Sequence, residues 1–390
     1  MIFELGEYRA RLSRCRKVMA EKGIEVLIES DPCNMNYLTG YDSWSFQYAQ
    51  AVIVTLEDED PLWIGRGVDL AGVRLTTFLP ESKVAAWPDH LVDNAVNHPM
   101  EFFAEQLSAR GLGRKAIGID RDCYFFTPRS RDVLQAGLPN ARFADAGRLV
   151  SWLRLVKSDA EIKIMSEAAR LTERIMAAFF EVVRPGLREC DAIAEIYKAQ
   201  VAGTPEFGGG YCCVAPLMPV GEGTSTPHMT WSDRKFVKGE AAYLETAGVR
   251  HRYHVPMVRA LHLGTPPQRL VDTSKAVIEG IERALEVARP GNTCEQVEAA
   301  WRKAISRYSI EKESRIGYSI GLGYPPDWGE HTASLRPRDR TVLQENMTLH
   351  MVCGIWNQDW GGVSLSEPFH ITARGAALFA DVPRDLHIKT

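Results

Sequence analysis

The first 150 residues alternate short apolar runs with helical stretches. A helical pattern covers residues 99–109, and the apolar runs that read as strands lie at residues 24–28, 51–56, 61–65 and 116–120. This alternation predicts an α/β unit with a largely parallel or mixed sheet covered by helices. A chain of 390 residues is too long for one core of ordinary size, so we expect a second domain.

The second part of the chain opens with a helix-start signal. Ser158 and Glu161 form a capping box, in which each side chain bonds the backbone N–H of the other residue. Further helices are expected at residues 191–201, 266–288 and 293–308, and strands at residues 241–246, 255–262, 347–355 and 369–372. The predicted domains are therefore residues 1–150 and 151–390.

The composition excludes several classes of protein. The chain is 45% hydrophobic and 25% charged with a net charge of -4, and no dense run of Lys and Arg suggests a nucleic-acid partner. No segment approaches the ~20 apolar residues of a membrane span, and the charged N-terminus lacks the apolar core of a signal peptide. Eight cysteines without a C-x-x-C pair favour reduced thiols. We therefore expect a cytoplasmic protein with neither nucleic acid nor membrane as its partner.

Several segments together resemble the pita-bread family, which includes methionine aminopeptidase, aminopeptidase P, prolidase and creatinase. They follow the family order: RLVKSDAEIKIM (154–165), His228, GEAAYLETAGVRHRYHVPMVRAL (239–261), ARPGNTCEQV (288–297), RIGYSIGLGY (315–324), VLQENMTLHM (342–351) and GGVSLSEPFHIT (361–372). The resemblance implies an α/β (α+β) fold with a creatinase-like N-terminal domain and a C-terminal pita-bread catalytic domain.

The metal-ligand positions of the family depart from its pattern. The peptidases of the family bind two divalent metals with two Asp, one His and two Glu. An ungapped alignment places at those positions Glu245, Pro256, Tyr318, Val352 and Ser366. Only Glu245 is a good ligand for hard divalent cations. The resemblance to creatinase, which also lacks the metals, implies hydrolysis of a C–N bond with no metal and no cofactor.

The histidines of the chain offer a different candidate metal site. His251 and His254 form an H-x-x-H pair, and His350 and His370 lie on later strands. On a strand, a spacing of three residues places the two rings of such a pair on opposite faces. The pattern therefore favours no bound metal.

The resemblance implies that His228 is the acid/base, because it aligns with the histidine of that role in creatinase-like enzymes. Imidazole titrates near neutral pH, so it can take a proton from water and return it to a leaving nitrogen. Glu245 would face a cationic amidinium and either attack the amidine carbon or deprotonate water, unless it only pairs with a nearby arginine. Tyr318 either donates a hydrogen bond to the tetrahedral centre or is a core residue.

Other residues are candidates for holding the substrate. Arg259 either clamps a substrate carboxylate, which suits its planar fork, or forms an internal salt bridge. Glu367 takes the base role if Glu245 does not. Tyr253 lies on the same strand region as Arg259, and His331 belongs to a loop, residues 324–331, that could line the pocket.

An aromatic segment near the N-terminus supplies the last candidates. On a strand, Trp44, Phe46 and Tyr48 would point the same way, and aromatic faces attract delocalised cations. The resemblance implies a homodimer in which this segment reaches the active site of the partner subunit. Three segments look most like the members of the family that hydrolyse ectoine, a cyclic amidine with a carboxylate: this aromatic segment, residues 321–335 and the strand SLSEPFHIT (364–372). That implies N-acetyl-2,4-diaminobutyrate as the product.

Three alternatives remain at this point. They are another creatinase-like amidinohydrolase, a metal-dependent X-Pro aminopeptidase, and a catalytically silent protein used for binding. Turnover of ectoine, activity in a chelator and tolerance of His228→Ala distinguish them.

Overall fold

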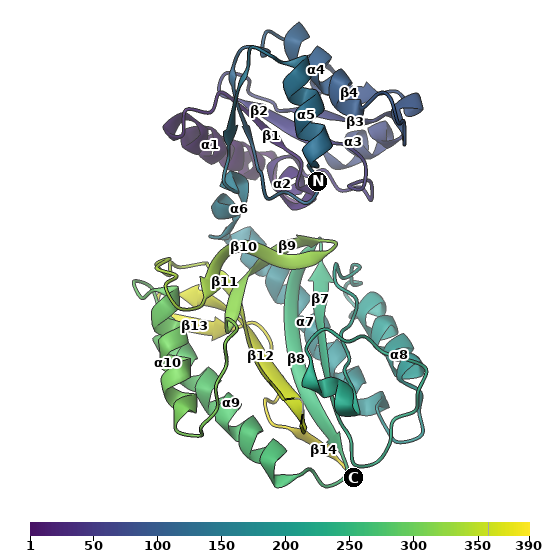
Figure 1. Ribbon diagram of the computed structural model, residues 1–390, viewed down its shortest axis with the longest axis vertical. Coiled ribbons are helices and arrows are strands. Elements are labelled where there is room, and N and C mark those ends of the chain that lie inside the picture. Colours follow the sequence, from purple (N-terminus) through teal and green to yellow (C-terminus); the bar gives the residue numbers. More distant parts are fainter. Residues whose placement is uncertain (358) are drawn as a thin grey trace. The chain divides into compact units, whose positions relative to one another are not determined.

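A computed structural model describes residues 1–357 and 359–390 of the chain (Figure 1). The chain folds into two compact units, residues 1–154 and 155–390. We call them the N-terminal unit and the catalytic unit. No helix among the described residues combines the length and apolar content required to span a bilayer.

The N-terminal unit contains a mixed sheet with the strand order β4-β3-β2-β1-β5-β6. Its strands are β1 Val26–Glu29, β2 Ala51–Thr55, β3 Leu62–Arg66, β4 Val84–Trp87, β5 Ala116–Ile119 and β6 Arg142–Asp145. Its helices are α1 Leu5–Glu21, α2 Pro32–Thr39, α3 Leu70–Thr76, α4 Pro99–Ala109, α5 Pro128–Gly137 and α6 Leu149–Arg154, with short 3-10 turns η1 Gly67–Asp69, η2 Glu81–Lys83 and η3 Asp89–Leu91. The mixed sheet covered by helices confirms the predicted α/β class.

Local signals account for several of these boundaries. Helix α1 ends before Gly23, whose φ of 65° suits glycine. Asp31 caps α2 by accepting hydrogen bonds from the N–H groups of Cys33 and Asn34, and Gly40 ends that helix in the left-handed region. Strand β1 is buried along its whole length between β2 and β5, which suits its Val-Leu-Ile run.

The aromatic segment is not a strand, which corrects the expectation that its three rings share one face. The N–H of Tyr48 donates to the C=O of Ser45, so the chain turns at this point. The Trp44 side chain is 58% exposed and its ring centroid lies 5.0 Å from that of Phe46, which is buried. Tyr48 instead packs under the Arg66 guanidinium, 4.7 Å away. A long-range bond decides this conformation, because the Ser45 hydroxyl donates to Asp69.

The catalytic unit contains a larger sheet with the order β13-β12-β11-β9-β8-β14, with β10 paired to β9 and β7 paired to β8. Its strands are β7 Ala241–Arg250, β8 Tyr253–Leu263, β9 Gly317–Tyr324, β10 Asp327–Leu335, β11 Thr348–Asn357, β12 Gly361–Thr372, β13 Gly375–Leu378 and β14 His387–Lys389. Its helices are α7 Asp159–Val182, α8 Glu189–Ala202, α9 Gln268–Val287 and α10 Cys294–Ser306, with a 3-10 turn η4 Gly221–Ser225.

The predicted capping box at the start of α7 is confirmed, with both of its hydrogen bonds formed between Ser158 and Glu161. Helix α9 lies beside β11 and β12, α10 packs against α9 and β10, and α7 lies beside β7 and β8 (Figure 1). Leu349, Met351 and Cys353 of β11 belong to the core packed with α9 and α10. Because side chains alternate along a strand, His350 and Val352 face the opposite side of the sheet.

Candidate active site

Glu245 lies near the middle of β7, where two neighbouring segments fix its backbone. It pairs with Val258 of β8 on one side. On the other side its N–H and C=O both bond to the backbone of Leu217, at 2.8 and 2.9 Å. Its side chain shares a face with that of Tyr243, two residues earlier on the strand. The backbone of Glu245 is therefore held on both sides by hydrogen bonds within the sheet, which fixes where its side chain starts.

Burial raises the pKa of Glu245 to about 7, and the negative charges of Asp327 and Cys212 act in the same direction. The residue is 9% exposed. Among residues 1–357 and 359–390, none donates a hydrogen bond to its carboxylate. Glu245 thus titrates near neutral pH and its oxygens are available to a bound molecule.

Tyr318 of β9 lies at the centre of a hydrogen-bonded chain. Its hydroxyl accepts a hydrogen bond from Trp328 Nε1 at 2.9 Å and lies 3.2 Å from His350 Nδ1. His350 Nε2 lies 2.7 Å from the Ser366 hydroxyl, which accepts a hydrogen bond from the N–H of Val258. The chain links strands β8, β9, β10, β11 and β12.

The partners of each group show which atom donates and which accepts in this chain of hydrogen bonds. The Ser366 hydroxyl accepts from the N–H of Val258, and His350 Nε2 is its acceptor among the described residues. A neutral imidazole that accepts at Nε2 carries its proton on Nδ1 and donates it to Tyr318. The Tyr318 oxygen then accepts two hydrogen bonds, so its own proton points away from both donors.

The protonation states agree with this arrangement. Burial lowers the pKa of His350 to about 3, with Arg259 and Arg315 acting in the same direction, so the ring is neutral near pH 7. Burial raises the pKa of Tyr318 well above its usual value, and the Glu245 charge adds to the effect. The phenol therefore remains protonated beside a carboxylate and is a hydrogen-bond donor to whatever binds there.

A second carboxylate and two further aromatic residues complete the surroundings. Asp327 lies 3.2 Å from His331 Nε2 and accepts a hydrogen bond from the N–H of Gly329. Burial opposes ionisation of Asp327, but these bonds outweigh it and lower the pKa of the group. On the other side, Tyr243 accepts a hydrogen bond from Trp356 Nε1 at 3.1 Å. Glu245 is thus placed among acidic and aromatic groups, which suits a delocalised cation.

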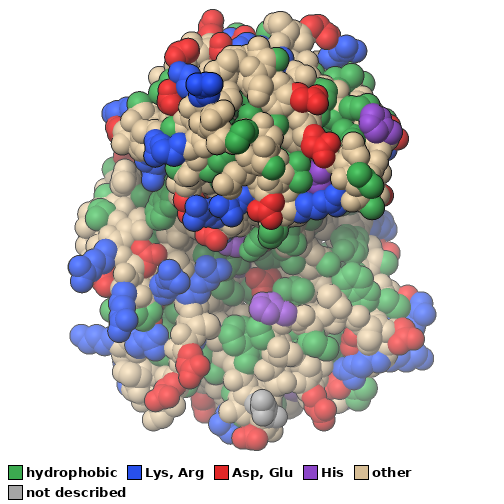
Figure 2. Space-filling view, turned by 45° about the horizontal axis from the view of Figure 1, so that its top comes forward, with side chains coloured by type: hydrophobic (Ala, Val, Ile, Leu, Met, Phe, Trp, Pro, Cys, Tyr) green, Lys and Arg blue, Asp and Glu red, His purple; other side chains and the backbone are tan. Residues whose placement is uncertain are grey.

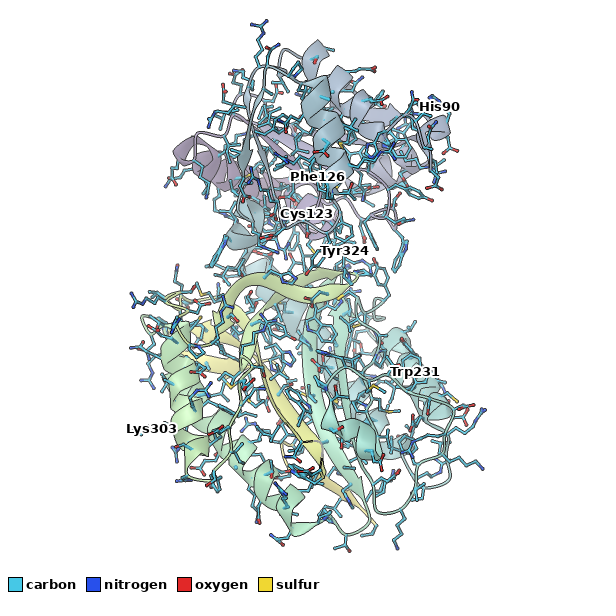
Figure 3. All side chains as sticks on the ribbon, viewed as in Figure 1. His90, Cys123, Phe126, Trp231, Lys303 and Tyr324 are labelled. Atoms are coloured by element: carbon cyan, nitrogen blue, oxygen red, sulfur yellow. The ribbon has the colours of Figure 1, made fainter. Side chains whose placement is uncertain are left out.

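Tyr243, Asp327 and Trp356 were not predicted from the sequence, and His350 was a candidate only as a metal ligand. Tyr243 could have been found from its position two residues before Glu245 on a strand. Asp327 pairs with Tyr324, labelled in Figure 3, where β9 turns into β10. No signal in the sequence pairs Trp356 of β11 with Tyr243 of β7, because that contact spans 113 residues.

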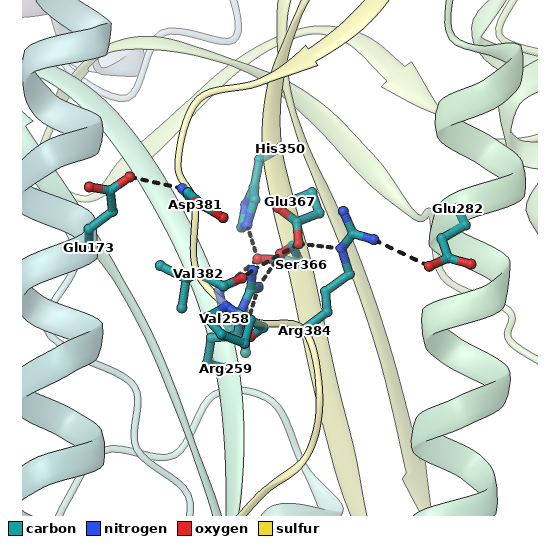
Figure 4. Close-up of polar contacts among 11 residues, drawn as sticks. Glu173, Val258, Arg259, Glu282, His350, Ser366, Glu367, Asp381, Val382 and Arg384 are labelled. Carbon is teal, nitrogen blue, oxygen red and sulfur yellow. Dashed lines mark hydrogen bonds and ion pairs between the residues drawn. The ribbon is translucent and has the colours of Figure 1, made fainter.

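Arg259 is a structural residue, which corrects its prediction as a substrate clamp (Figure 4). It is 0% exposed and uses all five N–H donors of its guanidinium within the protein. The acceptors are the Glu367 carboxylate and the backbone carbonyls of Val258, Ser366, Val382 and Pro383. No donor is left for a substrate carboxylate.

Glu367 and Tyr253 are likewise held inside the protein. Glu367 is buried, and one of its oxygens accepts from both Arg259 and Arg384 (Figure 4). Because it follows Ser366 on β12, it faces away from Tyr318. This geometry contradicts a contact between Glu367 and substrate. Tyr253 is buried and donates to Glu161 at 2.7 Å, so its hydroxyl stabilises the start of α7.

His228 lies in the segment that follows η4, with an exposed side chain. Within the described part of the chain it makes no hydrogen bond or ion pair. The same segment approaches the site at Thr226, whose C=O accepts the hydroxyl proton of Tyr243 at 2.5 Å. The acid/base role of His228 stays a prediction.

The donor set does not fit the two divalent metals of the family's peptidases. Pro256 and Val352 have no ligand atoms on their side chains, and Tyr318 and Ser366 are engaged in the hydrogen-bonded chain. His254 is buried, with its ring nitrogens bonded to backbone groups of Cys213 and Arg252. Across residues 1–357 and 359–390, no three His, Cys, Asp or Glu side chains are grouped as a metal site.

The fold and the position of Glu245 define a hydrolase of the pita-bread type. The chain belongs to metallopeptidase family M24, whose model matches residues 163–373, and the Creatinase/Prolidase N-terminal domain matches residues 11–156. These matches confirm the expected family, fold and enzyme class.

Two curated relatives share 42% identity with the chain. One is the ectoine hydrolase of Halomonas elongata, aligned over 99% of this chain and 98% of its own length. The other is an uncharacterized hydrolase/peptidase of Sinorhizobium fredii, which aligns over 99% of this chain and 98% of its own length.

Among solved structures, a prolidase from Thermococcus sibiricus superposes with a TM-score of 0.84 at 20% identity, over 98% of this chain and 99% of that one. Dipeptidase PepE from Mycobacterium ulcerans gives 0.82 at 21% identity, over 99% of both chains. At these identities the structures support the fold alone.

Proposed function

We propose that the protein hydrolyses the amidine of ectoine without a metal ion, giving N-acetyl-2,4-diaminobutyrate. One observation carries the proposal: Glu245 is a buried carboxyl group with a pKa of about 7 that accepts no side-chain hydrogen bond from the described residues, and its charge acts on the protonated Tyr318. The identity with the ectoine hydrolase of Halomonas elongata over nearly the whole chain supports the choice of substrate. Charges of both signs are interspersed on the face in Figure 2, which favours a small-molecule partner over nucleic acid.

The chemistry requires one water molecule for each ectoine. Oxygen adds to the amidine carbon, one of its two ring C–N bonds breaks, and the leaving nitrogen takes up a proton. Glu245 either attacks the amidine carbon itself or removes a proton from the attacking water. Tyr318 donates its hydroxyl proton in a hydrogen bond to the tetrahedral centre. We assign to His228 the return of the proton to the leaving nitrogen.

The proposal that the reaction needs no metal depends on which residues stand at the family's metal-ligand positions. Glu245 is the one carboxylate at the five positions that hold metals in the peptidases, and a single carboxylate is too few ligands for two divalent cations. A lone anion instead suits an amidinium, which carries the positive charge that the metals would otherwise supply. The same argument opposes an X-Pro peptidase activity.

Incubation of the purified protein with ectoine, followed by mass spectrometry of the products, tests the proposal. We expect an acetylated, ring-opened product, the same rate in EDTA, and a fall in kcat of about 10²–10⁴-fold in Glu245→Gln. Glu345→Gln, at an exposed position, is the matched control and keeps the wild-type rate. No turnover of ectoine, or turnover only after a divalent metal is added, would overturn the proposal. Creatine in the same assay tests the alternative amidinohydrolase.

Acid quench during turnover distinguishes the two roles of Glu245. If the carboxylate attacks, the intact mass of the enzyme increases by that of a substrate-derived group located on the Glu245 peptide. If it acts as a base, the enzyme keeps its own mass at every time point.

We further propose that the enzyme is a homodimer in which the aromatic segment, residues 44–48, contacts the catalytic unit of the partner subunit. The exposed Trp44 supports this proposal, because a large apolar side chain in solvent favours association. Sedimentation should give the mass of a dimer, and Trp44→Ala should raise the KM for ectoine. A monomer with full activity contradicts it.

A further inference from the structure

A substrate that carries both an amidinium and a carboxylate needs a cation as well as an anion in its site. Glu245 and Asp327 supply negative charge for the amidinium end. Arg259 cannot receive the carboxylate, because it is buried with every donor bonded to protein. The cation for the carboxylate must therefore be sought among other residues around Tyr318.

Arg315 lies two residues before β9, on the chain that leads directly into Tyr318. Its guanidinium carbon is 4.4 Å from the centroid of the Tyr318 ring, which is stacking distance. Its side chain is exposed, so a molecule in solution can reach it. The contact holds the guanidinium over a ring whose hydroxyl is bonded to Trp328 and His350.

The charges of Glu245 and Arg315 shift the pKa of Tyr318 in opposite directions. The Glu245 charge raises the pKa of Tyr318 and the Arg315 charge lowers it, so both groups lie within electrostatic reach of that ring. Arg315 also acts on His350, the next residue in the hydrogen-bonded chain. Tyr318 thus has an anionic neighbour in Glu245 and a cationic neighbour in Arg315.

The donors of Arg315 are available, in contrast to those of the neighbouring cations. In the part of the chain that the structure describes, its guanidinium makes no hydrogen bond or ion pair. Lys312, three residues earlier, is buried and its ammonium donates to the Ser314 hydroxyl and the Gly354 carbonyl. His331 is paired with Asp327. Arg315 is therefore suited to bidentate binding of a carboxylate.

We propose that Arg315 binds the carboxylate of the substrate while Glu245 faces its amidinium, so that the site selects small zwitterions over simple amidines. This inference rests on the proposed function, since it names the group that recognises the second charge of the same substrate. It assigns to Arg315 the clamp role that Arg259 cannot fill.

Steady-state kinetics with two substrates test the inference. Ectoine is compared with 2-methyl-1,4,5,6-tetrahydropyrimidine, which has the same cyclic amidine without the carboxylate. We expect Arg315→Met to raise the KM for ectoine by about tenfold or more, the worth of a hydrogen bond to a charged group, with kcat little changed. For the carboxylate-free amidine, KM stays at its wild-type value. Arg315→Lys, which keeps the charge and loses the fork, gives an intermediate KM.

Arg374→Met is the matched control, because it removes the same charge from an exposed turn between β12 and β13 and should leave both KM values unchanged. Added NaCl should raise the wild-type KM for ectoine and have little effect on Arg315→Met, since salt screens an exposed ion pair. Equal KM values for ectoine in wild type and Arg315→Met would overturn the inference while leaving the hydrolase proposal intact.

A direct measurement of ectoine binding tests the role of Arg315 separately from the proposed hydrolysis. If the wild-type protein hydrolyses neither amidine, the proposed function fails, and isothermal titration of ectoine then decides about Arg315. Binding to wild type that weakens about tenfold in Arg315→Met supports the carboxylate clamp. Equal binding to both proteins, or none to either, refutes it.

Discussion

Replacing Glu245 by Gln should stabilise the folded protein above neutral pH while removing its activity. The amide has nearly the shape of the carboxylate but carries no charge at any pH. Wild-type Glu245 must ionise in a buried position, next to the negative charges of Asp327 and Cys212, and that ionisation costs folding free energy. The variant avoids this cost.

The magnitude follows from the raised pKa. The step from the ordinary value of 4.5 to about 7 corresponds to about 3 kcal/mol, at about 1.36 kcal/mol for each pH unit. Because the folded state binds this proton more tightly than the unfolded state, the stabilising contribution is complete below pH 4.5. It is lost as the pH rises from 4.5 to about 7. Glu245→Gln should therefore equal the wild type near pH 4.5 and exceed it by about 3 kcal/mol at pH 8.

Urea unfolding of both proteins between pH 4.5 and pH 8.5, followed by circular dichroism, measures the difference directly. Glu345→Gln removes an exposed carboxylate of the same type and is the control, with a difference near zero at every pH. A stability difference between Glu245→Gln and wild type that does not change with pH would refute the reasoning, because only ionisation of a group with a raised pKa produces the slope. The wild-type kcat/KM should rise with pH through about 7, the range in which Glu245 becomes a carboxylate.

Three further variants test the surrounding structure. Tyr318→Phe removes the hydroxyl donor and should lower kcat by about 10²–10³-fold with the fold intact by circular dichroism; a kcat within twofold of wild type contradicts the donor role. Ser366→Ala leaves the buried N–H of Val258 without its acceptor, so thermal unfolding should show a loss of about 1–3 kcal/mol, and unchanged stability would contradict this hydrogen bond. Arg259→Met leaves the buried Glu367 with one of its two arginines and should cost about 3–5 kcal/mol in urea unfolding. A soluble, fully stable Arg259→Met protein would contradict that magnitude.

Local patterns were sufficient to predict many elements. The capping box of Ser158 placed the start of α7. The short, mostly apolar runs predicted β1, β2 and β5 because buried strands are rich in apolar residues. These features depend on residues within a few positions of one another, and the sequence shows such neighbours directly.

The sequence also predicted the chemistry of the candidate site. The order of motifs predicted the pita-bread fold, and the residues at the ligand positions showed that Glu245 stands there without a second carboxylate. This works because a ligand position has a chemical requirement that Pro256 and Val352 fail in any conformation.

Only the tertiary structure decided which charged groups are available to a substrate. Arg259 and Arg315 are both arginines near family motifs, yet the fold buries the first among backbone carbonyls and leaves the second stacked on Tyr318. The direction of the Tyr318 proton likewise depends on Ser366 and His350, which belong to other strands. Burial and pairing depend on which distant segments become neighbours, and a local pattern of residues does not contain that information.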